Sequence, residues 1–296
     1  MLTGMQIVVI GGDARQLEVI KKLTELDASI YLIGFEQLDH GFTGAVKKEL
    51  SEIDFTKVDS IILPVPGTNH EGKVDTVFSN EEIMLTEELI KLTPPHCVVF
   101  SGISNVYLDT ITSERNLVQL FERDDVAIYN SIPTVEGAIM MVIQHTDFTI
   151  HNSKTLVLGL GRVGMSTARA FHALGANVYV GARRSEHLAR ISEMGLIPFH
   201  LDDLETYASD ADTILNTIPA RIVTASVISK MPTHGLIIDL ASKPGGTDFR
   251  YAEKRGIKAL LAPGLPGIVA PKTAGKIVAN VISSLLQELK LERKGN

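Results

Sequence analysis

The sequence predicts an α/β protein with two doubly wound parallel sheets and a cleft between the two domains that carry them. Three observations support this fold class. Short apolar runs alternate with helix-like segments along the chain, and these runs end in glycine, proline or small polar residues. A chain of 296 residues is also longer than a single domain with one hydrophobic core usually is. We therefore expect two domains, each with helices on both faces of its sheet.

The first half of the chain begins with a predicted strand, Gln6–Ile10, which turns through two glycines into a helix over Ala14–Leu26. A second helix is expected over Glu81–Leu92, because its apolar residues have helical spacing and prolines follow it. The remaining strands predicted in this half are short apolar runs that end in turn residues: Ser29–Ile33, Ser60–Leu63 and Cys97–Phe100.

Between the two sheets, Pro133 and the residues after it fit a helix start, and the apolar pattern continues to about His145. A last helix, about Thr273 to Leu291, has one apolar face and is expected to return to the first domain. The predicted organisation is a first domain (1–133), a connecting helix (134–150), a second domain (151–270) and a C-terminal helix (271–296). The predicted strands of the second domain are Thr155–Leu158, Asn177–Val180, Thr213–Asn216, Leu236–Leu240 and Lys258–Leu261.

The most informative stretch is the glycine turn of the second domain, Gly159-Leu-Gly161-Arg-Val-Gly164. It follows a strand and opens an amphipathic helix, as in the Rossmann unit that holds a dinucleotide pyrophosphate at a helix N-terminus. Gly159 permits the tight turn, Gly161 lets the backbone approach the phosphates, and Gly164 lets helix and strand pack closely. The backbone N–H groups of Arg162 and Val163 are expected to bind the pyrophosphate.

The next strand runs into Gly181-Ala182-Arg183-Arg184, with no acidic residue at its tip. NAD-specific sites place an Asp or Glu there to accept the ribose 2′-hydroxyl. Two guanidinium groups instead suit a 2′-phosphate, so we predict NADP as the cofactor. The alternative is an arginine pair that is simply solvated on a surface loop.

Ligands of open α/β sheets bind beyond the carboxyl ends of the strands. Asn216, Thr217 and Pro219 are therefore expected to border the adenosine ribose and the pyrophosphate. The nicotinamide end is expected near two later loops, although these residues could simply terminate strands. The residues predicted for it are Leu240, Ala241, Pro263 and Gly264.

Composition excludes several other classes of function. The net charge of −7 argues against a nucleic-acid or anionic-membrane surface. No apolar stretch reaches the ~18 residues that span a bilayer, and no signal sequence opens the chain, so we expect a cytoplasmic protein. The single cysteine, Cys97, lies in an apolar run and is expected to be buried. The nine histidines have no metal-ligand spacing, and no metal site is predicted.

Several loops together carry a resemblance to a known family. They are G-G-D-A-R-Q (11–16), P-V-P-G-T (64–68), N-S-I-P-T-V-E-G (130–137), G-L-G-R-V-G (159–164), D-L-A-S-K-P-G-G (239–246) and A-P-G-L-P-G-I-V-A-P-K-T-A-G (262–275). In order and spacing this set resembles the A subunits of dipicolinate synthases of spore-forming bacteria, over essentially the whole chain. The loop 239–246 is also similar to that of alanine dehydrogenase and transhydrogenase, but it carries Lys243 where an Asp is expected in the alanine enzymes.

The resemblance implies an NADP-linked oxidation of dihydrodipicolinate, or of its hydrated tetrahydro precursor, to dipicolinate (pyridine-2,6-dicarboxylate). It places this reaction in the cytoplasm of the mother cell during sporulation. It also implies a partner, a flavoprotein-like second subunit, and we expect the chain to form a homo-oligomer. No nucleic-acid or membrane partner is expected.

A dicarboxylate substrate requires a local positive pocket in this acidic protein. Arg15 and Lys272 are the predicted carboxylate-binding cations. Asn130, Ser131 and Thr134 are predicted to add polar contacts at the hinge, although they also suit turn and N-cap positions.

Oxidation of the ring removes a hydride and a proton, and three residues are candidates for contact with the reacting substrate. Glu136 could accept the ring proton, although a carboxylate near a helix start is often only a capping partner. Ser101 could donate a hydrogen bond to a substrate carboxylate or could serve a turn. Lys243 lies in a loop expected near the nicotinamide, but it could also be simply solvated.

Two rival functions stay open. A D-2-hydroxyacid dehydrogenase needs a general-base histidine near its last strands, and residues 260–267 contain none. The chain could instead be an NADP-binding regulatory protein whose chemistry depends on a partner, because no side chain is an unambiguous acid or base.

Overall fold

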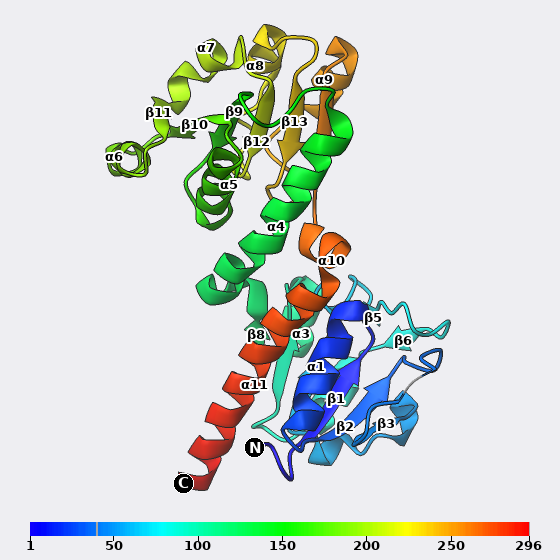
Figure 1. The fold of residues 1–296 in the computed structure, drawn as a ribbon. Helices are drawn as coiled ribbons and strands as arrows, with labels where there is room; N and C mark the ends of the chain where they lie inside the picture. The colour runs from blue at the N-terminus through cyan, green and yellow to red at the C-terminus, as the bar shows by residue number, and fades with distance from the viewer. Residues whose placement is uncertain (40, 296) are drawn as a thin grey trace. The chain divides into compact units, whose positions relative to one another are not determined.

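A computed structural model describes residues 1–39 and 41–295, and the chain divides into two compact units. Unit 1 comprises residues 1–126 and 271–296, and unit 2 comprises residues 127–270. Each unit contains a six-stranded sheet whose strands all run parallel (Figure 1). The predicted α/β class with two doubly wound parallel sheets is therefore confirmed.

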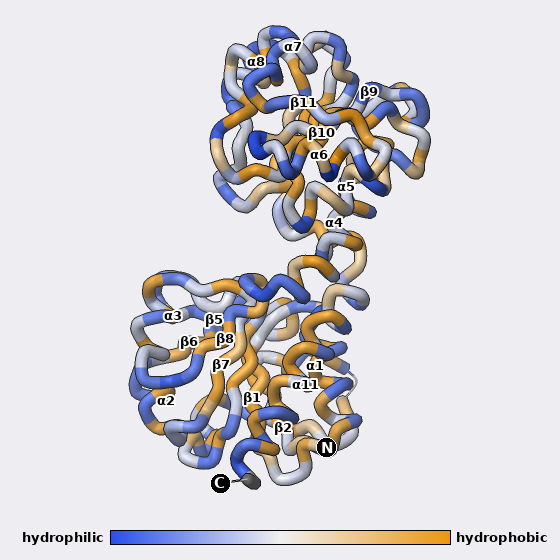
Figure 2. The backbone as a smooth tube through the Cα atoms, turned by 90° about the vertical axis from the view of Figure 1, so that its left-hand side faces the viewer, coloured by the Kyte–Doolittle hydropathy of each residue, from blue (hydrophilic) through white to orange (hydrophobic). Residues whose placement is uncertain are grey.

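The sheet of unit 1 has the strand order β3-β2-β1-β4-β7-β8. Its strands are β1 (Gln6–Ile10), β2 (Ser29–Ile33), β3 (Ala45–Lys47), β4 (Ser60–Ile62), β7 (Val98–Ser101) and β8 (Asn116–Gln119). Helices α1 (Ala14–Glu25) and α11 (Pro271–Gly295) share one core beneath the sheet, and α2 (Glu87–Leu92) and α3 (Val106–Ile111) share the core on the other face. In Figure 2 the central strands β1 and β7 are mostly hydrophobic, as expected for strands covered on both faces.

The sheet of unit 2 has the order β11-β10-β9-β12-β13-β14, which is the same arrangement relative to its first strand. Its strands are β9 (Lys154–Leu158), β10 (Asn177–Ala182), β11 (Ile197–His200), β12 (Thr213–Asn216), β13 (Leu236–Asp239) and β14 (Lys258–Leu261). One face packs against α4 (Asp124–His145), α5 (Arg162–Ala173) and α6 (Ser185–Glu193). The other face packs against α7 (Leu204–Ala208), α8 (Ala225–Lys230) and α9 (Phe249–Arg255).

Short elements complete both units. A two-stranded antiparallel ribbon, β5 (Lys73–Val74) with β6 (Ile83–Met84), belongs to unit 1. Helix α10 (Leu265–Val269) follows β14 in unit 2. The 3-10 turns are η1 (Leu50–Glu52), η2 (Phe55–Lys57), η3 (Leu120–Glu122) and η4 (Leu201–Asp203).

The largest differences from the predicted helix bounds are at α4 and α2. The connecting helix does not begin at Pro133, because α4 starts at Asp124 and Pro133 lies in its interior. Asp124 and Asp125 occupy its first turn, where acidic side chains stabilise a helix because its N-terminus carries partial positive charge. Unit 2 accordingly begins at residue 127. The predicted helix over Glu81–Leu92 is also shorter, because Ile83 and Met84 pair in the ribbon and Thr86 caps α2.

Helix α4 is long and apolar enough to cross a membrane by length and composition alone. This differs from the expectation that no segment passes such a test. The most apolar 18-residue window of α4 is 44% buried inside the protein, and core helices pass the same test. The buried side of α4, including Ala138 and Val142, packs into the core of unit 2.

Candidate functional site: a nucleotide-binding turn

The turn after β9 has a geometry that requires glycine at two positions. Gly159 has a φ of +97°, and a Cβ there would lie 2.8 Å from Thr217 Oγ1. A Cβ on Gly164 would lie only 2.2 Å from the carbonyl oxygen of Gly159. Any side chain at Gly164 would therefore separate α5 from the turn, as the sequence predicted for a close helix–strand contact.

Gly161 is different, because its Cβ would meet nothing within 4 Å. It is the N-cap residue of α5 and supplies no capping side chain. The first backbone N–H groups of a helix have no partners within the helix and carry partial positive charge. The open space above Gly161 therefore leaves the N-terminus of α5 accessible to an anion, which is the arrangement that binds a dinucleotide pyrophosphate.

A cavity of about 270 Å³ adjoins this turn and is lined by seven of the fifteen residues predicted for the cofactor. Its lining includes Gly159 and Gly161, the loop residues Thr217 and Pro219 after β12, and the end of β10 with the arginine pair. The loop after β12 is held against the turn because Thr217 donates hydrogen bonds from both N and Oγ1 to the carbonyl of Leu158.

The arginine pair at the end of β10 is exposed, and its two members have different surroundings. Arg184 pairs with Glu186 at 3.2 Å and hydrogen-bonds to Nε2 of His187. The side chain of Arg183 makes no hydrogen bond or ion pair with another described residue, and it borders both this cavity and a neighbouring one of about 240 Å³. The exposed carboxylate of Glu186 has a lowered pKa, because a backbone N–H at the start of α6 donates to it and Arg184 lies nearby.

A buried carboxylate organises the loop after β13. Asp239 is fully buried, and its two oxygens accept hydrogen bonds from Ala241 N, Asn216 Nδ2, Gly246 N and Thr247 Oγ1 at 2.7–3.1 Å. Gly246 in turn accepts from the loop after β12, at Ile222 N and Val223 N. Asp239 therefore orients this loop, and its side chain is fully engaged in doing so.

The residues predicted for the nicotinamide end lie on neighbouring loops of the same sheet edge. Leu240 donates its N–H to Asn216 O, which ties the loop after β13 to β12. Pro263 and Gly264 are exposed after β14, and Gly264 is the N-cap of α10. Lys243 is exposed and makes no hydrogen bond or ion pair with any other residue that the structure describes.

In unit 1, Arg15 is already engaged. Its guanidinium pairs with both carboxylate oxygens of Asp13, with N···O distances of 2.6–3.1 Å, and its side chain is only 13% exposed. Asp13 also caps α1 by accepting from the backbone N of Arg15. Burial raises the pKa of Asp13, but its hydrogen bonds and ion pair with Arg15 outweigh burial and leave this pKa lowered. Lys272 is exposed in the first turn of α11 rather than before it.

The polar residues predicted at a hinge lie inside α4 and not in a turn. Ser131 Oγ contacts Ile128 O and Ser166 Oγ, and Thr134 Oγ1 donates to Asn130 O. Asn130 is buried, and its Oδ1 has no hydrogen-bond partner among the described residues. Glu136 is exposed in the middle of the helix, so the interpretation of these residues as turn or N-cap positions is wrong.

The two remaining sequence candidates of unit 1 are buried. Ser101 is fully buried at the end of β7, and its hydroxyl donates to Ile103 O at 2.6 Å. Cys97 is fully buried, which confirms that this cysteine is a small core residue, and burial raises the pKa of its thiol to about 11. Within residues 1–39 and 41–295, no three His, Cys, Asp or Glu side chains gather as a metal site would require.

Sequence reasoning missed two residues that help to define these turns. His187 lines the cavity beside the arginine pair, and its position three residues after Arg184 on α6 was the available signal. Asp13 fills the N-terminus of α1, and an aspartate directly before a helix is a common N-cap signal.

The fold and the open glycine turn define the class of this protein, a two-domain dehydrogenase type with a nicotinamide-nucleotide-binding domain. Residues 133–296 match the family model of the C-terminal domain of alanine dehydrogenase/PNT, and residues 6–121 match the model of the N-terminal domain of the dipicolinate synthase A subunit. The chain is 66% identical, over 99% of both chains, to the A subunit of dipicolinate synthase from Bacillus subtilis (strain 168). It therefore belongs to the family of dipicolinate synthase A subunits.

Solved structures agree with this assignment. The A subunit of dipicolinate synthase from Bacillus subtilis matches with a TM-score of 0.96 over 99% of both chains, at 66% identity. Its counterpart from Bacillus halodurans matches with a TM-score of 0.95 over 97% of this chain and 99% of its own, at 65% identity. A transhydrogenase from Sinorhizobium meliloti has 16% identity and a TM-score of 0.68 over 96% of this chain and 95% of its own, so that likeness concerns the fold alone.

Proposed function

We propose that the chain oxidises dihydrodipicolinate, or its hydrated tetrahydro precursor, to dipicolinate with hydride transfer to NADP. The observation that carries this proposal is the 66% identity, over nearly the whole chain, to a protein named as the A subunit of dipicolinate synthase. The accessible N-terminus of α5 supports it, because an oxidation by this class of domain needs a bound nicotinamide dinucleotide. The proposed location is the cytoplasm of the mother cell of a sporulating bacterium.

In the proposed reaction, the dihydropyridine ring loses a hydride to the nicotinamide and a proton to an acceptor, which leaves the aromatic dicarboxylate. The hydrated tetrahydro precursor must first lose one molecule of water to form this ring. Aromaticity stabilises the product, so the main contribution of the protein is to orient the ring against the nicotinamide. Lys243 is the proposed substrate contact in unit 2, because it is exposed and has no partner among the described residues. Its loop is fixed by Asp239 beside the loop that borders the cofactor cavity.

In unit 1, we propose Arg15 and Lys272 as the groups that bind substrate carboxylates. Arg15 already holds the carboxylate of Asp13 with a two-point contact, the geometry with which arginine recognises carboxylates. Binding of substrate to Arg15 would require Asp13 to share or release the guanidinium. Ser101 is less suited to substrate contact because it is fully buried and its hydroxyl is engaged.

The NADP preference is proposed from the arginine pair and His187, which gather at the end of β10 beside the cavity. The charge of Glu186 works against a 2′-phosphate, because its carboxylate lies 3.2 Å from Arg184. We therefore expect Glu186→Gln to strengthen NADP binding by about twofold to threefold and to leave NAD binding unchanged.

The deciding experiment follows reduced-nicotinamide absorbance with NADP⁺ and freshly generated dihydrodipicolinate, with and without the proposed flavoprotein-like second subunit. Turnover by this chain alone is the expected result, and NAD⁺ serves as the matched cofactor control. Turnover only in the presence of the flavoprotein-like partner would instead support the alternative of an NADP-binding regulatory protein. No turnover in either arm would refute the synthase activity and leave only the nucleotide-binding domain.

A further inference from the structure

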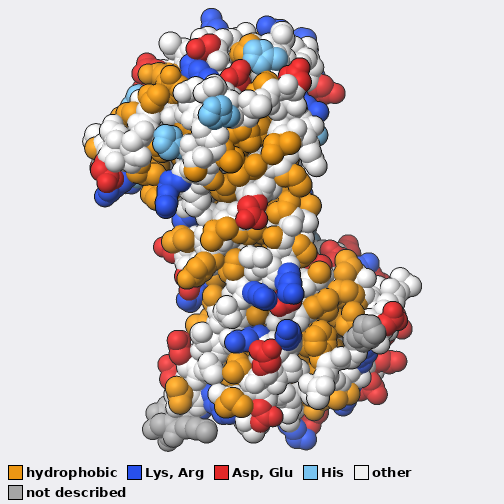
Figure 3. Space-filling view, viewed as in Figure 1, with side chains coloured by type: hydrophobic (Ala, Val, Ile, Leu, Met, Phe, Trp, Pro, Cys, Tyr) orange, Lys and Arg blue, Asp and Glu red, His pale blue; other side chains and the backbone are white. Residues whose placement is uncertain are grey.

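The outer side of α4 is unusually apolar for an exposed helix surface. Five large hydrophobic side chains on it are between 36% and 64% exposed: Ile128, Tyr129, Ile132, Met140 and Ile143. They recur at helical spacing along one side of the helix, and all belong to unit 2. We call this surface the α4 ridge. Figure 3 shows hydrophobic side chains gathered over α4 on the side that faces the viewer.

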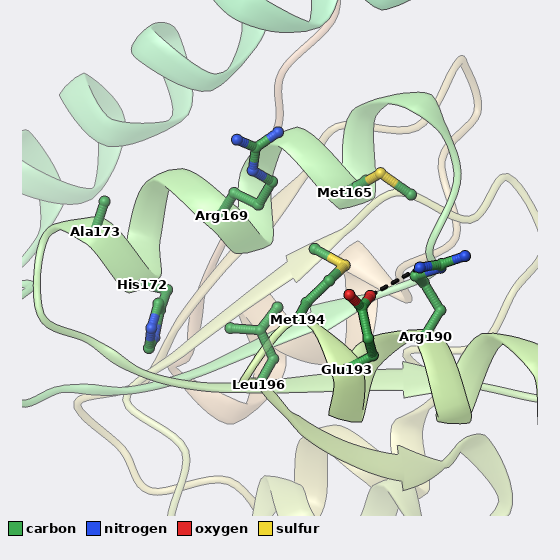
Figure 4. A pocket seen from close by; sticks show the side chains of 8 residues that line it. All are labelled: Met165, Arg169, His172, Ala173, Arg190, Glu193, Met194 and Leu196. Carbon is green, nitrogen blue, oxygen red and sulfur yellow. Dashed lines mark hydrogen bonds and ion pairs between the residues drawn. The ribbon is translucent and has the colours of Figure 1, made fainter.

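A groove lies on the same layer of helices, between α5 and α6. It has a volume of about 640 Å³, and its apolar lining includes Met165, Met194 and Leu196 (Figure 4). Ala173 leaves room at one side because its side chain is small. Helix α5 separates the groove from the α4 ridge, and Ser131 of α4 contacts Ser166 of α5 at 2.7 Å. Ridge and groove are therefore neighbouring features of one surface.

The charged residues of this surface have a complementary arrangement. Glu136 lies on the α4 ridge among the apolar side chains, and it makes no hydrogen bond or ion pair with another described residue. Arg169 lines the groove and is likewise without such a partner within the described ranges. Arg190, on the other side of the groove, is already paired with Glu193 at 2.8 Å. Among the described residues, Glu136 on the ridge and Arg169 in the groove are thus charged groups of opposite sign without a partner.

We propose that this surface is an isologous interface with a second copy of the chain, in which the α4 ridge of each copy packs into the α5–α6 groove of the other. In an interface with two-fold symmetry, both copies use the same surface patch, so this patch must contain both members of every contact. This surface meets the requirement in shape, with a ridge beside a groove, and in charge, with Glu136 of one copy facing Arg169 of the second. Apolar patches of this kind on soluble domains mark interaction sites.

The test is the oligomeric state of the full-length chain, measured by sedimentation velocity between about 0.5 and 100 µM. The wild type is expected to dimerise. Ile132→Glu on the ridge and Ala173→Trp in the groove should each weaken the dimer at least tenfold. Val106→Glu is the matched control, because Val106 is 77% exposed but lies on α3 in unit 1. A wild type that stays monomeric at 100 µM, or a dimer that both variants leave intact, would overturn the proposal.

The ion pair gives a second test that separates a second copy from other partners. Glu136→Arg and Arg169→Glu should each weaken dimerisation, and the double swap should restore it to within about threefold of wild type. Vesicles of phosphatidylcholine and phosphatidylglycerol provide the membrane arm. If a monomeric chain binds these vesicles or the flavoprotein-like partner, and Ile132→Glu abolishes that binding, the ridge has a different partner and the proposal is wrong.

Discussion

In both sheets the first strand leads through glycines into a twelve-residue helix, and the two turns differ in what occupies the helix N-terminus. In unit 1 the carboxylate of Asp13 caps α1 and pairs with Arg15. The space above Gly12 is also filled, because a Cβ there would lie 2.5 Å from Gln16 Cγ. In unit 2, Gly161 caps α5 with no side chain and has open space around it.

This comparison teaches that strand order alone does not create a phosphate site. Both units have the same sheet topology, and both place a helix N-terminus at the carboxyl edge of the first strand. The N-terminus in unit 1 already holds an internal anion, whereas that in unit 2 remains available for an external one. The N-cap residue is therefore the feature by which the two turns differ as candidate anion sites, and under the proposed function it favours nucleotide binding at the second sheet.

The largest expected effect comes from giving unit 2 the cap of unit 1. Gly161→Asp should weaken NADP binding by about 100-fold, because the new carboxylate occupies the anion site and repels the pyrophosphate. The fold should survive, since Gly161 has an ordinary φ of −80° and Asp is a favourable N-cap. Isothermal titration measures the binding, and thermal unfolding measures the stability. Unchanged NADP affinity would show that the pyrophosphate does not bind at α5.

A second contrast concerns the last residue of the fifth strand in each sheet. Asp239 holds four hydrogen bonds, and Ser101 at the corresponding position donates one. Asp239→Asn should lower the free energy of unfolding by about 2 kcal/mol, because an amide group then faces buried donors. Ser101→Ala should cost about half as much. Urea unfolding of both variants checks this order, and equal losses would contradict it.

The two units also differ at the end of the second strand of each sheet. In unit 2 an arginine pair follows β10, whereas no such pair follows β2 in unit 1. Replacing Arg183 and Arg184 together by Ala should weaken NADP binding about 20-fold and change NAD binding by less than about threefold. Arg190→Ala is a matched control on α6, outside the residues that line the cavity. Equal losses for NADP and NAD would refute the role in 2′-phosphate binding.

The smallest expected effect is on the stability contributed by the turn before α1, where Asp13 caps the helix. The pKa of Asp13 is lowered in the folded protein, so its contribution to stability is present above the unfolded pKa and is lost as the pH falls through the lower, folded pKa. Asp13→Asn should therefore destabilise the protein at pH 7, by less than about 1 kcal/mol because the carboxylate is 38% exposed. Below about pH 4 the difference from wild type should shrink. Denaturant unfolding at pH 7 and pH 3 measures it, and the same difference at both values would be inconsistent with this origin.

The interior strands and the glycine turn were predictable from the sequence because their signals are local. Gln6–Ile10, Ser29–Ile33 and Thr213–Asn216 are continuous apolar runs, and their predicted bounds match the structure. Of the missed strands, β3, β8 and β11 lie at the edges of the two six-stranded sheets, and β5 and β6 form the short two-stranded ribbon. An edge strand pairs on one side only, and β11 even contains Pro198, so the local apolar signal is weak.

The sequence predicted the parts of the site that the backbone forms. It predicted less well the parts that depend on which partner a side chain contacts. Gly159, Gly161 and the end of β10 line one cavity, as the motif predicted. The pairing of Arg15 with Asp13 depends on rotamers that spacing does not reveal. Pro133 indicated a helix start by propensity, but the apolar packing of Val126, Ala138 and Val142 continues on both sides of it and extends α4.

Unit 1 is made of two separate chain segments, residues 1–126 and 271–296, and its core can be completed during synthesis only when the second segment has been made. The sheet of unit 1 is made first, yet its core includes the fully buried Ile282 and Leu286 of α11. A growing chain therefore releases the whole of residues 127–270 before the apolar face of α1 can be covered. The half of the protein that leaves the ribosome first is thus the last to become complete, and until then it is the part that most needs protection from aggregation.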